Sequence, residues 1–289
     1  GGNRPPALAL PTLTDDALRG RLLLYGGLTA GNDAVNPGNI WSLDVTDPAA
    51  PVWSRSTVTG NQTPRFGHAA AYVAAFDALV VSGGFSATNA ARADTWALVL
   101  GPGDPYWVRM ANAGFFARGG HALISDAQRQ RLVAFGGADA VEGGGAVAFM
   151  DVLDISGGLD GSDRWRRLSP QTPMSARAFM ASGWDEASRL WWHQGGVDAN
   201  RTLNELVVAD LGPDAPIWTN TQVVAGGPNQ RFFAAAAWDP GRQQLVVHGG
   251  TRNRQQTLRD AYALRYLDAE TTPTATTAAT GTSSATSSP

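Results

Sequence analysis

Short apolar runs recur along the chain, and each of them stops at a pair of glycines. The runs cover residues 22–25, 79–81, 132–135, 190–192 and 245–247. Brief apolar segments bounded by turn-forming residues are typical of buried β-strands. An earlier apolar segment, such as residues 66–72, precedes the run in each unit, so the pattern predicts a repeated pair of strands.

The repeat has a regular spacing. The glycine pairs begin at Gly26, Gly83, Gly136, Gly195 and Gly249, at intervals of 57, 53, 59 and 54 residues. In four units an arginine lies 18 residues before the first glycine, at Arg65, Arg118, Arg177 and Arg231. The second glycines of those pairs are Gly84, Gly137, Gly196 and Gly250. A period of about 50 residues predicts a β-propeller in which each repeat forms one blade.

Two further strands complete the expected unit. After each glycine pair comes a loop of variable length, and then an apolar segment at residues 40–45, 95–99, 152–155, 205–208 and 261–264. A fourth segment begins with a tryptophan in four units, at Trp53, Trp107, Trp165 and Trp218. Each unit therefore predicts a four-stranded sheet.

These features together resemble the kelch repeat. The residues that carry the resemblance are Arg65 and His68 in Arg-x-x-His, the strand ending in Gly-Gly, the Asp-x-Trp-x-Leu of residues 94–98, and the later tryptophan. The first repeat departs from it, with Leu8 and Pro11 in the arginine and histidine positions. The resemblance covers about residues 8–267 and implies an all-β fold: a kelch-type β-propeller of four-stranded antiparallel blades, five repeats visible. We expect this domain over residues 1–269.

The repeated residues are expected to serve the scaffold. A glycine pair suits a strand end where sheets crowd together or where φ is positive. The tryptophans are expected to wedge between adjacent blades, and the arginines to bridge backbone carbonyls between turns.

Closure of the ring leaves two alternatives open. The last repeat lacks a tryptophan strand, which by spacing would fall at residues 272–278. Threonines there suit a strand, and an edge tolerates Pro273; alternatively, blades upstream of residue 1 complete the ring. Twelve of residues 271–289 are Thr or Ser, so residues 270–289 are interpreted as a Thr/Ser-rich tail, a linker or an O-glycosylated stalk.

Composition excludes several functions. The net charge of −3 argues against nucleic acid as a partner, and no apolar run approaches the length of a membrane span. The absence of cysteine removes disulfides, thiolate metal sites and cysteine nucleophiles. It also excludes the copper radical oxidases among kelch-like propellers, which need a cysteine cross-linked to tyrosine.

The sequence offers no convincing catalytic or metal-binding set. His68 and His121 share one repeat position and are expected to be structural, while His193 and His248 would form a metal pair only if adjacent blades brought them together. Asp154, Asp160 and Asp163 suggest calcium less well than turn hydrogen bonding. We therefore expect no catalytic residue, no metal and no cofactor.

The loops after the glycine pairs differ most between repeats, and binding residues concentrate on such loops. The candidate binding residues are Asn32, Asp33, Asn89, Arg92, Asp139, Glu142, Asp198, Arg201, Arg252 and Arg254. Two sequons, at Asn61 and Asn200, are candidate glycosylation sites. Two are close to the number expected by chance in this length and add little, so the expectation of an exported protein rests on the hydroxyl-rich tail.

These features favour a non-catalytic extracellular or cell-surface binding or scaffold module that recognises a protein or a glycan through loops on one propeller rim. The alternatives are a carbohydrate-active propeller enzyme, epimerase- or lyase-like, or a structural subunit of a surface filament or layer.

Overall fold

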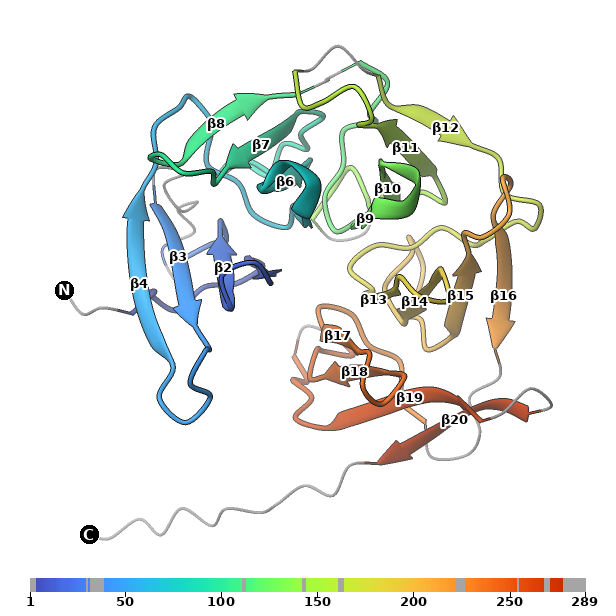
Figure 1. The fold of residues 1–289 in the computed structure, drawn as a ribbon. Helices are drawn as coiled ribbons and strands as arrows, with labels where there is room; N and C mark the ends of the chain where they lie inside the picture. Colours follow the sequence, from blue (N-terminus) through green and yellow to red (C-terminus); the bar gives the residue numbers. More distant parts are fainter. Residues whose placement is uncertain are drawn as a thin grey trace, which may run out of the picture.

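The computed structural model describes residues 4–29, 31, 39–110, 113–141, 144–160, 164–221, 227–253, 255–267 and 271–277. The fold is a five-bladed β-propeller, and each blade is a four-stranded antiparallel sheet (Figure 1). The strands of every blade follow one another in the sequence. The prediction of an all-β propeller with four-stranded antiparallel blades is thus confirmed.

The strands of the five blades have the following bounds. Blade 1 consists of β1 (Thr12–Asp16), β2 (Arg21–Tyr25), β3 (Asn39–Asp44) and β4 (Val52–Thr57). Blade 2 consists of β5 (Ala69–Val73), β6 (Ala78–Ser82), β7 (Thr95–Val99) and β8 (Tyr106–Arg109). Blade 3 consists of β9 (Ala122–Asp126), β10 (Arg131–Phe135), β11 (Met150–Asp154) and β12 (Arg166–Leu168). Blade 4 consists of β13 (Ala181–Asp185), β14 (Leu190–Gln194), β15 (Leu206–Asp210) and β16 (Ile217–Thr221). Blade 5 consists of β17 (Ala235–Asp239), β18 (Gln244–His248), β19 (Ala261–Leu267) and β20 (Thr271–Thr277). Two short 3-10 helices, η1 (Ala74–Phe76) and η2 (Ala127–Arg129), connect the first two strands of blades 2 and 3.

The last strand comes from the Thr/Ser-rich segment. β20 pairs antiparallel with β19, and the register shifts between Arg265 and Leu267. The threonine-rich segment therefore supplies the fourth strand of the last repeat; that blades upstream of residue 1 complete the ring stays an untested alternative. Because β20 is the outermost strand of its sheet, Pro273 lies where a missing backbone donor is tolerated.

The hydrophobic core lies between successive blades. Between blades 2 and 3, for example, Val80 and Ala97 pack with Leu132 and Leu153. Similar apolar clusters join blades 1 and 2, 3 and 4, and 4 and 5. Three of the repeated tryptophans lie in these clusters, namely Trp107, Trp165 and Trp218. Successive side chains of a strand point to opposite faces of the sheet, so each inner blade packs apolar residues against both of its neighbours.

A chain of backbone hydrogen bonds also links the blades. In every blade, the residue two positions before the first strand has a left-handed φ of 56–64°. These turn residues are Leu10, Gly67, Gly120, Phe179 and Phe233. From blade 2 to blade 5, the amide of each donates to the carbonyl of its counterpart in the preceding blade, with N···O distances of 3.0, 2.7, 2.6 and 3.0 Å.

A second series involves the glycine pairs. The amide of the second glycine donates to the carbonyl of the repeat arginine in the following blade, over 2.8–3.0 Å; the donors are Gly27, Gly84, Gly137 and Gly196. Among the described residues, the amide of Gly250 makes no such bond to blade 1. In the first series, the amide of Leu10 likewise makes no bond to the carbonyl of Phe233 in blade 5. Both series stop at the boundary between blade 5 and blade 1, which we call the seam. In Figure 1 the ribbons of these two blades lie apart.

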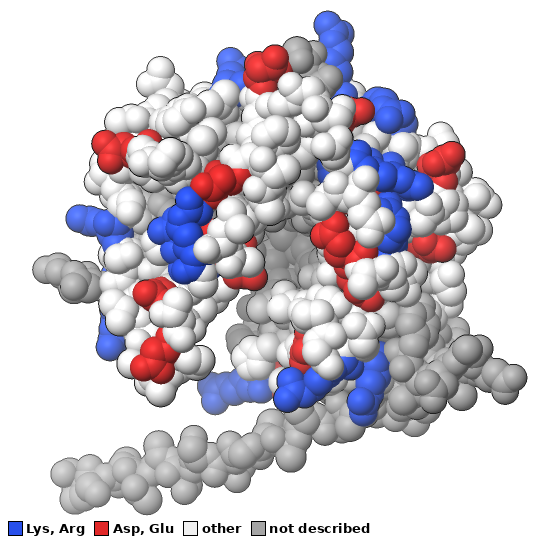
Figure 2. All heavy atoms as spheres, viewed as in Figure 1, with Lys and Arg blue, Asp and Glu red and all other residues white. Residues whose placement is uncertain are grey.

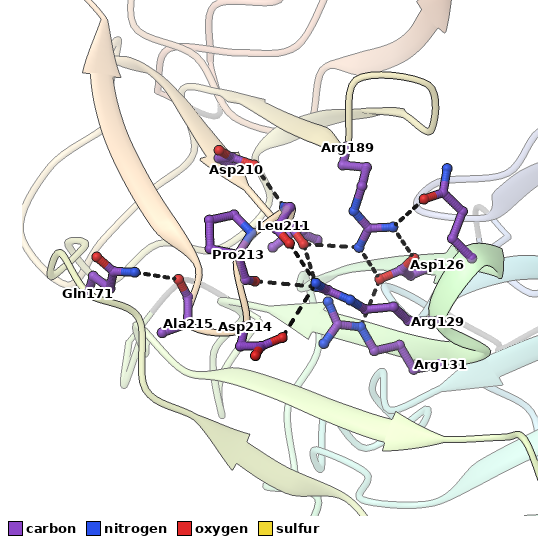
Figure 3. Close-up of polar contacts among 12 residues, drawn as sticks. Asp126, Arg129, Arg131, Gln171, Arg189, Asp210, Leu211, Pro213, Asp214 and Ala215 are labelled. Atoms are coloured by element: carbon purple, nitrogen blue, oxygen red, sulfur yellow. Dashed lines mark hydrogen bonds and ion pairs between the residues drawn. The ribbon is translucent and has the colours of Figure 1, made fainter.

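Ion pairs also join blades on the rim that carries the connections between the first and second strands. Figure 3 shows the buried Asp126 of blade 3 with Arg131 of its own blade and Arg189 of blade 4, at N···O distances of 2.7 and 2.8 Å. Burial opposes ionisation of Asp126, but hydrogen bonds from Arg189 and Arg131 outweigh it and lower the pKa of the carboxyl. Arg129 donates to Leu211 O over 2.6 Å in the neighbouring blade. These contacts fix the blades relative to one another.

Candidate binding site

Three of the predicted loop residues line one pocket. Asp198 and Arg201 of blade 4 and Arg252 of blade 5 surround a cleft of about 560 Å³, between the loops that follow two glycine pairs. We call it the rim pocket. Phe232, which is buried, and Asn253 also contribute to its walls. The pocket therefore combines charged and amide groups with one aromatic surface.

The conformation of the blade 4 loop is set by Asp198. Its Oδ1 accepts hydrogen bonds from the amides of Asn200 and Arg201, over 2.7 and 2.8 Å. This is an Asx-type turn, which aspartate favours because its short side chain reaches the backbone two residues ahead. Much of the hydrogen-bonding capacity of Asp198 is thus used inside its own loop, and its role is to shape the pocket.

The basic side chains remain more available. The Arg201 side chain is 66% exposed and contacts Glu205 Oε1 at 3.3 Å. In the neighbouring loop, the Nε of Arg252 is buried and has no hydrogen-bond partner among the described residues. Thr202 Oγ1 donates to the carbonyl of Arg252 over 2.8 Å and holds the two loops together. A ligand with a carboxylate or hydroxyl groups would match these donors.

The remaining candidates lie elsewhere. Asn89 has φ 62° and its amide donates to Ser86 O over 2.9 Å, so it forms a tight turn in blade 2. Arg92 is half-buried and donates to Pro64 O over 3.3 Å. Burial, and then the charge of Arg65, lower the pKa of Arg92. Asp139 lies on the corresponding loop of blade 3. Asn32, Asp33, Glu142 and Arg254 lie outside the described residues.

The repeat arginines are fully buried, and each is bonded within its own blade. Arg65 and Arg231 donate to Gly83 O and Gly249 O, both over 2.8 Å. Each also faces an acidic side chain in the same blade; these partners are Asp94, Asp151, Glu205 and Asp260. The sequence predicted the bond to backbone carbonyl and missed the acidic partners. The equal spacing of 29 residues from Arg65 to Asp94 and from Arg231 to Asp260 is the signal that identifies two of them.

The glycine pairs have both of the properties expected from the sequence. All of them have positive φ. A Cβ added to Gly83 would lie 2.3 Å from the carbonyl oxygen of Arg118 in the next blade. Glycine is required there both by its conformation and by the close approach of the neighbouring backbone.

The centre of the ring holds a larger cavity. Residues of all five blades line this space of about 800 Å³, including Leu13, Gly120, Met180 and Ala237. Figure 2 shows the molecule hollowed at its centre, with acidic side chains around the opening. The lining is mainly apolar, and at the seam it includes residues of blades 1 and 5.

The histidines near this cavity are structural. His68 Nε2 and Thr12 Oγ1 share a hydrogen bond of 2.9 Å, and His121 Nε2 and Ser82 Oγ share one of 2.8 Å. Each bond joins a blade to the preceding one. Burial, followed by the charge of Arg65, lowers the pKa of His68 to about 3. Burial likewise lowers the pKa of His121, so both imidazoles are neutral at physiological pH.

The other two histidines do not meet. His193 is fully buried among Phe135, Trp191 and Trp218, and burial lowers its pKa. His248 is exposed at the seam. Within the described ranges, no group of three or more His, Asp or Glu side chains is placed to hold a metal ion. None of the helices in that part of the chain is long and apolar enough to span a membrane.

The fold and the two cavities define the class of protein: a five-bladed β-propeller with a pocket between the loops that follow the glycine pairs of blades 4 and 5. A comparison of the sequence with protein-family profiles finds no family that matches.

Proposed function

We propose that this chain is a kelch-type propeller and acts as a non-catalytic binding module, recognising a protein or a glycan at the rim pocket. The kelch assignment rests on the repeated arginine and glycine pair. In all four blades that have the arginine, its guanidinium donates to the carbonyl of the first glycine of the pair or to an acidic side chain of the same blade. The exposed sequon at Asn61, which lies outside the rim pocket, supports an extracellular or cell-surface location.

The observation that carries the proposal is the convergence of two basic residues from different blades. Arg201 and Arg252 lie far apart in the sequence and line one pocket, together with amide side chains and Phe232. A ligand that offers a carboxylate beside hydroxyl or amide groups, such as an acidic peptide or a uronic acid, suits these donors.

The chemistry of the pocket supports binding over catalysis. Its hydroxyl group, on Thr202, donates to a backbone carbonyl, and the carboxylate of Asp198 accepts two backbone amides. Neither group has a histidine beside it in the pocket lining. The arrangement thus supplies recognition without a nucleophile and base pair.

A binding screen tests the proposal. The purified chain is applied to an array of acidic and neutral glycans and to a panel of cell-surface proteins. Arg201→Gln and Arg252→Gln are expected to weaken any specific interaction by about tenfold or more, equivalent to about 1.4 kcal/mol for each lost charged contact. Arg242→Gln is the matched control, because Arg242 is 75% exposed and lies at the opposite rim. Ligands whose affinity is the same in all four proteins would contradict the assignment of the rim pocket.

A further inference from the structure

The face that blade 5 presents to the seam is uncovered. Ala235 and Ala237 of β17 are exposed, whereas the corresponding Ala69 and Ala71 of β5 are 6% and 7% exposed beneath blade 3. His248, at the end of β18, is exposed in the same way, and its counterparts in the other blades are buried. Blade 5 thus has the face of a stacked blade without a neighbour on it.

The facing side of blade 1 is uncovered as well. Leu13 of β1 is 55% exposed. Leu22 of β2 is partly exposed, although the residues at its position in all four other blades are fully buried. Those residues are Leu79, Leu132, Trp191 and Leu245. The two faces differ in size: blade 5 offers small side chains, and blade 1 offers leucines.

The backbone groups at the seam point to the same vacancy. On blade 5, the amide of Gly250 and the carbonyl of Phe233 make none of the inter-blade bonds that their counterparts make within the described part of the chain. On blade 1, the same is true of the amide of Leu10 and the carbonyl of Leu8 among the described residues. The unpaired groups are thus one donor and one acceptor on each side, which is the set that one inserted repeat would satisfy.

We propose that the seam is the docking site for one further four-stranded antiparallel blade, supplied by a partner polypeptide. Its larger apolar face would cover Ala235 and Ala237, and its smaller face would cover Leu13 and Leu22, as in the stacking of blades 2 and 3. Its left-handed turn residue would donate to Phe233 O and accept from the amide of Leu10. Its Gly-Gly turn would donate to the carbonyl of Leu8. The site is independent of the rim pocket.

Blade 2 of this chain provides a defined probe. Residues 60–110 contain the turn residue Gly67, the Gly83-Gly84 pair and the four strands. The side of this blade that faces blade 3 is small, with Ala69, Ala71 and Val80, and therefore suits the leucines of blade 1. A synthetic peptide of residues 60–110 is mixed with the full chain.

Protection of a single cysteine gives the readout. The chain has no native cysteine, so Leu13→Cys is the unique target of a maleimide dye. At probe concentrations about tenfold above its dissociation constant, the labelling rate is expected to fall about tenfold. Leu18→Cys is the control, because Leu18 is 63% exposed and lies outside the seam; its labelling should not change. A peptide carrying Leu79→Asp and Leu98→Asp should not protect Leu13→Cys.

A fused form covers the case in which the free peptide aggregates. Residues 60–110 are joined to the N-terminus of the full chain by a flexible linker, and Leu13→Cys is again labelled. Protection in this form, lost on introducing the two aspartates into the added segment, supports the proposal. Unchanged labelling of a soluble fusion overturns it.

Two alternatives, direct closure of blades 5 and 1 and occupation of the seam by a second copy of the chain, are distinguished with cysteine variants. In the closed boundary between blades 4 and 5, a Cβ built on Gly183 lies 3.5 Å from the Cβ of Trp238, which is disulfide range. The corresponding seam residues are Ala237 and Asp15, so rapid oxidation of an Asp15→Cys/Ala237→Cys variant would show that blades 5 and 1 close directly and would overturn the proposal. Protection of Leu13→Cys that rises with chain concentration alone would assign the seam to a second copy and overturn it as well.

Discussion

The guanidinium of Arg65 and the carboxylate of Asp94 form a two-pronged ion pair inside blade 2, with both N···O distances at 2.8 Å. Arg65 is fully buried and also donates to Gly83 O. The hydrogen bonds from Arg65 oppose the effect of burial on Asp94 and lower its pKa. The pair therefore fastens the loop that precedes β5 to the loop that precedes β7.

Replacing Arg65 with leucine is expected to destabilise the fold by about 3–5 kcal/mol, because Asp94 would keep a partly buried charge without its partner. Arg65→Lys should recover little of this loss, since an ammonium cannot make the two-pronged contact. Urea denaturation measures both effects. Arg242→Leu, at an exposed surface pair, should leave the unfolding free energy nearly unchanged. Equal stability of Arg65→Leu and wild type would contradict a structural role for the repeat arginine.

Alanine at the first glycine of a pair should cost more inside the ring than at the seam. Gly83 and Gly249 have φ of 57° and 67°, so each substitution carries about 1–2 kcal/mol of backbone strain. Gly83→Ala adds a clash with Arg118 O, whereas a Cβ on Gly249 meets only Leu258 O at 3.4 Å. Gly83→Ala should therefore be worse by about 1–3 kcal/mol in thermal or urea unfolding. Similar costs at the two sites would indicate a neighbour packed on blade 5.

Acid should destabilise the protein before its carboxylates titrate. Burial lowers the pKa of His68 to about 3 from 6.5 and also lowers that of His121 and His193. Below pH 6.5 the unfolded chain binds protons at these sites and the folded chain does not, so stability is complete above pH 6.5 and falls on acidification. Each histidine contributes up to about 1.4 kcal/mol per pH unit. Urea titrations from pH 8 to pH 4.5 measure the slope, and a flat profile would contradict neutral buried imidazoles.

His193→Leu should reduce that slope and raise stability. Both imidazole nitrogens of His193 are buried without a hydrogen-bond partner among the described residues, and the ring packs against Phe135 and Trp218. Replacing an unpaired buried polar group with an apolar one of similar size is neutral or stabilising. The gain should be larger at pH 5 than at pH 8. A loss of stability at both pH values would show that the nitrogens are satisfied by bound water.

The blades could be predicted from the sequence because their signals are local. An apolar run that ends in Gly-Gly, as at residues 79–84, combines a buried strand with a turn of positive φ, and both follow from residue type alone. Residue type alone does not predict β20, because threonines that favour a strand also dominate linkers. None of the acidic partners of the repeat arginines was predicted. The 29-residue spacing in blades 2 and 5 could have identified Asp94 and Asp260, but Asp151 lies 33 residues after Arg118.

The sites were less predictable because they depend on which blades are neighbours. Arg201 and Arg252 were expected on one rim, but their shared pocket follows from the stacking of blades 4 and 5. The sequence left closure of the ring open, but the residues on the two faces of the seam gave no signal of their exposure. Leu22 and Leu79 are the same residue at the same repeat position, yet Leu79 is fully buried and Leu22 is partly exposed. Exposure there is decided by the adjacent blade and not by the residue.

Amide hydrogen exchange at the inter-blade bonds tests the open seam most directly. The amides of Gly67 and Gly84 donate across closed blade boundaries, so they should exchange slowly. The equivalent amides of Leu10 and Gly250 face the seam and should exchange much faster, at rates close to those of exposed loops. Protection of Leu10 and Gly250 equal to that of Gly67 and Gly84, in the isolated chain, would contradict an open ring.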